Sequence, residues 1–246
     1  MCSILGIFGT SPSDDLSALR PLALSHSARQ RHRGPDWSGV YVALGALLVH
    51  ERLAIVDPAG GAQPLRSGDG TLALAVNGEI YNHKALERGL AVPYAFQTGS
   101  DCEIINALYR EHGADFLPKL NGIFAFALWD AAQQRYLVAR DPIGVCPLYQ
   151  GRDAQGRLWI ASEMKALVGA CEQIAVFPPG HFLDSRVGEI LAYWHPAWRD
   201  YATTRGVAVA PDVMRAGFQQ AVHSQLMTDV PYGVLLSGGL DSSLVA

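Results

Sequence analysis

The sequence has little charge, few cysteines and no long apolar run, and each scarcity excludes a class of protein. Charged residues make up 17% of 246 positions and the net charge is −4, so the basic excess typical of nucleic-acid binding is missing. The longest apolar runs, 43–49 and 72–76, are far too short to span a bilayer, and the start lacks the features of a signal peptide. We therefore expect a cytoplasmic globular protein with neither a membrane nor a nucleic-acid partner.

The four cysteines, Cys2, Cys102, Cys146 and Cys171, are scattered without a C-x-x-C pair. This spacing indicates neither a zinc site nor a disulfide framework, so we predict no bound metal. The three internal cysteines are most simply small buried side chains. Only Cys2 has a position that suggests chemistry.

Cys2 follows the initiator methionine directly. Its side chain is small, so an aminopeptidase could remove Met1 and leave Cys2 with both a thiol and a free α-amine. An α-amine titrates near pH 7.7–8.0, so about neutral pH it can accept the thiol proton without a histidine partner. The apolar, glycine-punctuated residues 3–9 predict a strand that would hold this end of the chain. On position alone, the alternative that Cys2 has no reactive role is equally open.

The fold is predicted from short strand-like runs that recur with turn residues between them. Such spacing favours an α+β protein with two packed antiparallel sheets and a few helices outside them. Helices are expected over 21–30, with Pro21 at the first position, over 81–90, and after the capping box Ser100-x-x-Glu103. The strand-like runs are 37–44, 47–56, 71–80, 122–129, 136–140, 148–150, 158–161, 182–184 and 190–193.

The pattern changes after about residue 195. Residues 196–211 are loop-like, 211–227 have helical spacing, and 232–236 read as a buried strand. That strand leads directly into Ser237-Gly238-Gly239-Leu240-Asp241-Ser242-Ser243. A Gly-Gly turn before a helix offers backbone N–H groups to phosphate oxygens, although it could be a simple connector. The Gly-Lys-Ser/Thr ending of a Walker loop is absent, which disfavours a GTPase-like function.

Two further stretches carry groups that suit catalysis on an amino acid. Asn77-Gly78 could supply two neutral donors to a developing oxyanion, or it could be an ordinary Asn-Gly turn. Arg52 suits a carboxylate and Asp101 suits an ammonium, although either charge alone is more often a solvated surface group. Together they match an α-amino acid, which carries both ionic groups on one carbon.

These motifs occur in one order on one chain, and the whole set resembles the B-type, glutamine-hydrolysing asparagine synthetases. The resemblance implies a class II glutamine amidotransferase domain at 2–195, a linker at 196–210 and the start of an α/β, ATP-pyrophosphatase-type synthetase domain at 211–246. The implied fold of the first domain is the four-layer αββα sandwich of N-terminal-nucleophile hydrolases. The stretches that carry the resemblance are Cys2, 31–36, 50–57, 77–82, 99–101 and 237–243.

The resemblance also implies roles for single residues in glutamine hydrolysis. Cys2 would attack the side-chain amide with its freed α-amine as base, and the thioester would then be hydrolysed to glutamate. This half would need no cofactor. The remaining implied roles are an oxyanion hole of Asn77 and the Gly78 N–H, a carboxylate site at Arg52, a pocket wall of Leu53, Ala54, Ile55 and Val56, an ammonium site of Glu79 and Asp101, and support from Arg33.

In the family, ammonia passes to a synthetase domain where ATP and Mg²⁺ activate aspartate. The sequence ends at Ala246, directly after the loop that would bind pyrophosphate, so we expect glutamine hydrolysis but no asparagine synthesis from this chain. Alternatives are the amidotransferase half of another adenylating synthetase, such as a β-lactam-forming one, and a catalytically silent regulatory module. A homodimer is one option for its assembly. The implied ATP-site residues are Leu236, Ser237, Gly238, Gly239, Leu240, Asp241 and Ser242.

Overall fold

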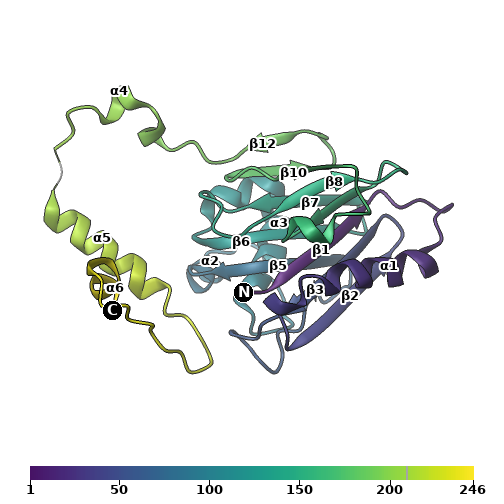
Figure 1. Cartoon of the computed structure of the whole chain (residues 1–246), viewed down its shortest axis with the longest axis horizontal. Helices are drawn as coiled ribbons and strands as arrows, with labels where there is room; N and C mark the ends of the chain where they lie inside the picture. The colour runs from purple at the N-terminus through teal and green to yellow at the C-terminus, as the bar shows by residue number, and fades with distance from the viewer. Residues whose placement is uncertain (209) are drawn as a thin grey trace. The chain divides into compact units, whose positions relative to one another are not determined.

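The computed structural model describes residues 1–208 and 210–246. The chain forms two compact units, Met1–Trp194 and His195–Ala246, and each is described separately below. Figure 1 shows the strands gathered in the first unit and helices with long connections in the second. The functional division into 2–195, 196–210 and 211–246 stays a prediction.

The first unit contains two six-stranded sheets in which the described strands all pair antiparallel. In order across the first sheet the strands are β10 (Gln173–Val176), β8 (Tyr149–Arg152), β9 (Leu158–Ala161), β1 (Ser3–Phe8), β3 (Ala46–Arg52) and β2 (Trp37–Ala43). The second sheet contains β12 (Ile190–Ala192), β11 (His181–Asp184), β7 (Arg135–Arg140), β6 (Gly122–Asp130), β5 (Leu72–Ile80) and β4 (Leu65–Arg66). The short strands β4 and β10 were not predicted from the sequence pattern.

Helices cover the outer faces of both sheets. On the first sheet, α1 (Leu16–Ala28) buries Leu19 and Ala23 in a cluster with residues of β1, β3 and β9. On the second sheet, α2 (His83–Arg88) and α3 (Ile104–His112) contribute to a separate apolar cluster with β5 and β6. A third cluster lies between the two sheets. The predicted α+β, four-layer αββα sandwich is therefore confirmed. Four 3₁₀ segments complete the unit, at Arg31–Arg33, Asp101–Glu103, Gly113–Lys119 and Met164–Ala166.

Alternation along the strands assigns each side chain to the helix side or to the space between the sheets. In β1, Ile4 packs between the sheets, whereas Leu5 packs under α1. In β5, Ala73 and Ala75 pack between the sheets. Asn77 has the same parity and therefore continues along the inner face. The strand itself thus delivers an amide side chain into the interior of the sandwich.

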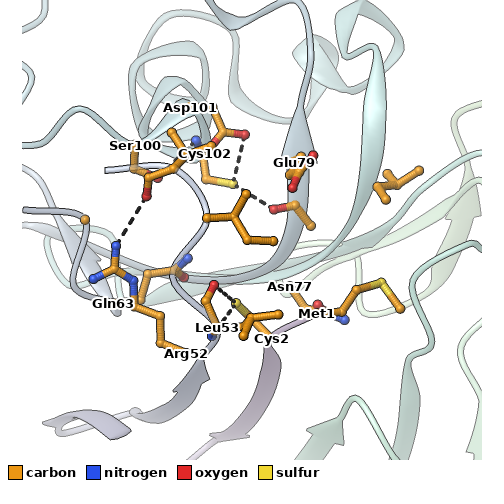
Figure 2. Close-up of a pocket in the computed structure, with 15 residues that line it drawn as sticks. Met1, Cys2, Arg52, Leu53, Gln63, Asn77, Glu79, Ser100, Asp101 and Cys102 are labelled. Atoms are coloured by element: carbon orange, nitrogen blue, oxygen red, sulfur yellow. Dashed lines mark hydrogen bonds between the residues drawn. The ribbon is translucent and has the colours of Figure 1, made fainter. Parts of the chain in front are cut away.

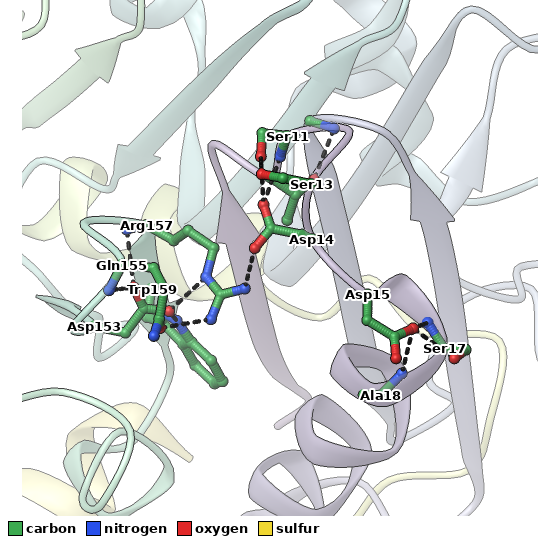
Figure 3. A network of polar contacts seen from close by, with 12 residues as sticks. Ser11, Ser13, Asp14, Asp15, Ser17, Ala18, Asp153, Gln155, Arg157 and Trp159 are labelled. Atoms are coloured by element: carbon green, nitrogen blue, oxygen red, sulfur yellow. Dashed lines mark hydrogen bonds and ion pairs between the residues drawn. The ribbon is translucent and has the colours of Figure 1, made fainter.

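The start of α1 is fixed by acidic side chains, which Figure 3 shows. The Asp15 carboxylate caps the helix by accepting the Ser17 and Ala18 N–H groups at 2.9 and 3.2 Å. Asp14 pairs with Arg157 at 2.9 Å and so ties this turn to the segment before β9. The predicted helix start at Pro21 is wrong, because the Asp15 cap begins the helix at Leu16 and leaves Pro21 inside it.

The capping box at Ser100 is formed only in part. The Ser100 side chain accepts the Cys102 N–H at 3.3 Å, but it opens a 3₁₀ turn before α3 begins at Ile104. The Glu103 carboxylate accepts the N–H groups of Gln97 and Thr98, both at 2.8 Å. Glu103 therefore organises the loop before the helix and does not complete the predicted box.

The second unit agrees with the sequence prediction in its main helix and differs from it in the segments on either side. The stretch expected to be a loop contains a 3₁₀ turn at Ala197–Arg199 and α4 (Tyr201–Thr204), while residue 209 of the predicted linker lies outside the described residues. The helix expected at 211–227 is α5 (Pro211–Ser224). The strand expected at 232–236 is irregular, and Leu235 is 98% exposed. A buried strand needs a neighbouring strand, and the described part of this unit contains none.

Among the described residues, no helix combines the length and the apolar character that crossing a membrane requires.

Candidate active site

A pocket forms where β1 begins and where β3 and β5 end. Since β3 runs antiparallel to β1, with Ser3 opposite Glu51, the residues just outside this pairing are Cys2 and Arg52. The end of β5 adds Asn77, Gly78 and Glu79 from the second sheet. Figure 2 shows the side chains of Cys2, Arg52, Asn77 and Glu79 together with those of the loop at 100–102. The lining consists of Met1, Cys2, Arg52, Leu53, Ile55, Val56, Gly61, Gln63, Asn77, Gly78, Glu79, Ser100, Asp101, Cys102 and Ile123.

The Cys2 thiol is held against the backbone that follows β3. Its sulfur accepts the Leu53 N–H at 3.3 Å and lies 3.5 Å from the Leu53 carbonyl oxygen, to which the thiol can donate. The Arg33 Nε–H donates to the Cys2 carbonyl oxygen at 3.1 Å and fixes the backbone as well. Burial raises the pKa of the Cys2 thiol above its ordinary value, and the bond from the Leu53 N–H opposes this only in part. The resting sulfur is therefore a thiol, and nucleophilic attack needs a base.

Asn77 presents an amide that no protein group satisfies. Its side chain is fully buried, and neither Nδ2 nor Oδ1 has a hydrogen-bond partner. A buried amide of this kind costs free energy unless a ligand or water completes its bonds. Asn77 is therefore prepared to donate to something that enters the pocket.

Gly78 lies where a side chain would not fit. A Cβ added there would come within 2.0 Å of the Ile123 carbonyl oxygen on β6, and the φ angle is +151°. The close approach of β5 and β6 thus requires glycine at this position. The Asn-Gly pair lies within β5, which continues to Ile80, and is not the tight turn that was the alternative interpretation.

Arg52 ends β3, so the strand predicted to continue to Val56 stops four residues earlier. The buried guanidinium donates to the carbonyl oxygens of Val56, Asp57 and Pro58 at 3.3, 2.6 and 3.2 Å. These bonds curl the chain after β3 around its own arginine. They use three of the five N–H groups of a guanidinium, which leaves donors for a ligand carboxylate.

The pocket also contains two carboxylates, those of Asp101 and Glu79, which can bind a cation. Burial raises the pKa of Asp101 above its ordinary value, although the Ile80 N–H, at 2.6 Å from Oδ2, favours the ionised form. Burial also raises the pKa of Glu79, and the neighbouring Asp101 carboxylate adds to this effect. An ammonium bound between them would relieve both influences. Arg52 and this acidic pair in one pocket can accept a zwitterion.

All residues predicted for glutamine binding and catalysis line this pocket except Ala54. Ala54 is not among the lining residues; its N–H instead donates to the Asp36 carboxylate at 2.9 Å. Sequence reasoning missed the contribution of Gln63, whose Oε1 accepts the Val76 N–H at 2.7 Å beside Asn77. A glutamine in a loop carries no periodic signal, so only the folded structure reveals it. Further lining residues that were not predicted are Met1, Gly61, Ser100, Cys102 and Ile123.

The remaining cysteines are more deeply buried than Cys2. Cys102, Cys146 and Cys171 are buried free thiols, as the sequence predicted. Across the described residues, no group of three or more histidine, cysteine, aspartate or glutamate side chains is arranged to hold a metal ion.

The predicted ATP-site residues lie in the second unit, at the start of α6 (Leu240–Val245). Ser237 and Ser242 hydrogen-bond to each other at 2.8 Å, and Gly238 has a φ of +79°. The motif is exposed, with Leu236 and Leu240 at 59% and 76%. The residues described here form a turn but no wall that could enclose a nucleotide, so they do not fit an ATP site by themselves.

Comparisons with known proteins follow the division between the two units. A family model described as a glutamine amidotransferase domain matches residues 1–187, and one described as asparagine synthase matches residues 214–246. Asparagine synthetase B [glutamine-hydrolyzing] of Escherichia coli (strain K12) is 52% identical over the whole chain, which covers 44% of that protein. Asparagine synthetase [glutamine-hydrolyzing] 3 of Arabidopsis thaliana is 51% identical over the whole chain, which covers 42% of it. The chain thus spans less than half the length of these relatives.

Two solved structures are similar in fold to this chain. The allosteric regulatory enzyme of purine biosynthesis matches 74% of this chain and 46% of its own, with a TM-score of 0.60 and 26% identity. Glutamine phosphoribosylpyrophosphate amidotransferase from B. subtilis matches 79% of this chain and 50% of its own, with a TM-score of 0.62 and 23% identity. The second likeness bears on the fold alone.

Proposed function

We propose a glutaminase function for this chain, which belongs to the glutamine amidotransferase domain family. Cys2 would hydrolyse the side-chain amide of glutamine to glutamate and ammonia. The observation that carries this proposal is the unsatisfied, buried amide of Asn77, which lines the same pocket as the Cys2 thiol.

In the first step the Cys2 sulfur forms a bond to the amide carbon of glutamine. Because burial keeps the sulfur protonated, the thiol proton must pass to a base as the bond forms. Removal of Met1 would provide that base as the α-amine of Cys2 itself. The amide oxygen becomes an oxyanion, which Asn77 Nδ2 and the Gly78 N–H would stabilise.

In the second step the carbon–nitrogen bond breaks. The leaving nitrogen takes a proton from the α-ammonium and departs as ammonia, and a thioester remains on Cys2. Water then adds to the thioester carbon, with the α-amine accepting a proton from it, and glutamate is released with the thiol restored. The same two donors would stabilise the oxyanion of this step.

Recognition of glutamine would use both charged sides of the pocket. The α-carboxylate would pair with Arg52, and the α-ammonium would lie between Glu79 and Asp101. Leu53, Ile55 and Val56 would line the path of the side chain. The raised pKa values of both acids support this assignment, because a bound cation would restore their ionised forms.

The fuller activity would belong to a longer protein. The match of residues 214–246 to asparagine synthase supports the role of this chain as the ammonia-producing half of an asparagine synthetase. Aspartate and ATP would be substrates of that protein and Mg²⁺ its cofactor. The described second unit lacks the walls that a nucleotide needs. Glutamine is therefore the substrate proposed for the chain itself.

The test measures ammonia release from L-glutamine by the chain with Met1 removed, alongside the Cys2→Ala variant. We expect turnover by the Met1-free chain with Cys2 intact and none by the variant. Equal release from both, or none from either with a folded protein, would contradict the proposal and favour a silent regulatory module.

A further inference from the structure

Asp57 connects the two loops that carry the charged sides of the pocket. Its Oδ2 accepts the Gly99 N–H at 2.8 Å, across 42 positions of sequence. Gly99 lies two residues before Asp101 and directly before Ser100, both of which line the pocket. The carboxylate of Asp57 thus holds the loop of the proposed ammonium site.

The backbone of the same residue holds the arginine. The Asp57 carbonyl oxygen accepts from Arg52 Nη2 at 2.6 Å, the shortest of the three bonds that the guanidinium makes with this loop. Asp57 Oδ1 and the same carbonyl also accept the N–H groups of Gly60 and Gly61, both at 2.9 Å. Asp57 is therefore fixed in its own loop while it contacts both charged sides.

The backbone conformation of Asp57 and the glycines near it allow these hydrogen bonds. Its φ angle is +46°, in the left-handed region where asparagine and aspartate are enriched among side-chain-bearing residues. A Cβ at Gly60 would lie 2.7 Å from Asp57 Oδ2, and one at Gly99 would lie 3.4 Å from its carboxyl carbon. Glycines on both loops thus allow the backbone to approach the carboxylate closely.

We propose that Asp57 is a positioning residue that fixes the distance between the guanidinium of Arg52 and the carboxylate of Asp101. An α-amino acid carries its two ionic groups at a fixed separation, so a rigid spacing favours such a substrate over amides that lack either group. Asp57 touches no reacting atom in this arrangement. The inference rests on the proposed glutaminase function, because that function assigns the two charges to one substrate.

The experiment compares Asp57→Asn and Asp57→Gly in the chain 2–246, from which Met1 has been removed. Asparagine tolerates the left-handed φ but has one neutral acceptor in place of two charged ones, and glycine keeps the φ and removes the carboxylate. We expect KM for glutamine to rise roughly tenfold in the Asn variant and further in the Gly variant, with kcat within about twofold. Asp69→Asn is the matched control, since Asp69 also caps a turn but lies in the loop between β4 and β5.

A second readout does not depend on turnover. Iodoacetamide alkylates Cys2 without needing either charged site, and L-glutamate should protect Cys2 by occupying both. We expect the alkylation rate to be unchanged in both variants, and the glutamate concentration for half-protection to rise in parallel with KM. The Asp69→Asn control should change neither value.

The outcomes separate the two proposals. A wild-type chain that releases no ammonia would refute the glutaminase function, and the protection assay would still report on Asp57. An active wild type with unchanged KM and unchanged half-protection in both Asp57 variants would overturn the inference alone. A fall in kcat or in the alkylation rate that accompanies the rise in KM would also overturn the inference. General damage to the pocket would then explain the effect.

Discussion

Both units carry a recognisable sequence motif. The motif residues of the first unit line a pocket, whereas those of the second unit, among the described residues, are mostly exposed. In the first unit the strands deliver Cys2, Arg52 and Asn77 to one pocket, and Asn77 is fully buried. In the second unit the turn at Ser237 and Gly238 is formed, yet the strand expected before it is irregular and exposed. A motif thus supplies the atoms of a site, whereas neighbouring layers supply its burial and its fixed geometry.

The largest difference between the two units is expected in kcat, when Asn77 is replaced. Asn77→Ala should lower kcat for glutamine hydrolysis roughly 100- to 1000-fold, because it removes one of the two oxyanion donors. Ser237→Ala in the second unit should leave kcat unchanged. Steady-state ammonia assays measure both, and a similar loss from the two variants would contradict the assignment of chemistry to the first unit.

Stability should differ between the units in the same way. Leu48 is fully buried on β3 between the sheets, whereas Leu235 is 98% exposed. Leu48→Ala should lower the free energy of unfolding by about 3 kcal/mol, and Leu235→Ala should change it by less than about 0.5 kcal/mol. Urea denaturation monitored by tryptophan fluorescence measures both values. Comparable losses would mean that the second unit also has a packed core.

A smaller difference between the two units is expected in KM for glutamine. Arg52→Leu should raise KM for glutamine between roughly tenfold and a hundredfold, because the substrate carboxylate loses a charged donor. Arg205→Leu, at an exposed position of the second unit, should leave KM as it is. An unchanged KM in the Arg52 variant would mean that the carboxylate binds elsewhere.

Acid should also act on the first unit, through His50. Burial lowers the pKa of His50 to about 4, and its Nε2 contacts the Val76 carbonyl oxygen at 2.9 Å across the sandwich. Below pH 6.5 the unfolded chain takes up a proton that the folded chain excludes, so stability falls as the pH falls toward 4.

This contribution amounts to about 2 kcal/mol between pH 6.5 and pH 5. His50→Gln should make the unfolding free energy less dependent on pH over that range, as urea titrations at several pH values would measure. An unchanged slope would contradict the role of His50.

The alternation of residues along the strands and the order of the motifs were enough to predict much of the fold and of the pocket. The parity that places Ala73 and Ala75 between the sheets also places Asn77 there. The pocket residues were predicted with the exception of Met1, Gly61, Gln63, Ser100, Cys102 and Ile123. The starts of the helices were predicted less well. Asp15 caps α1 ahead of Pro21, and Glu103 binds N–H groups of the preceding loop, because local hydrogen bonds override the simpler pattern.

The loop contacts at the pocket had no sequence signal. Gln63 and Asp57 act through bonds to Val76 and Gly99, and no periodicity or spacing relates these pairs. The expected strand at 232–236 failed for a different reason. An apolar run predicts burial only where other strands exist to bury it, and the described second unit offers none.

The central claim is that the Cys2 sulfur bonds to the amide carbon of glutamine. Mass spectrometry of peptides from enzyme quenched in acid during turnover tests it most directly. We predict a glutamyl adduct on an N-terminal peptide that begins at Cys2, and its absence from the Cys2→Ala variant. Ammonia release with no adduct on Cys2, or turnover by chains that all retain Met1, would contradict the account.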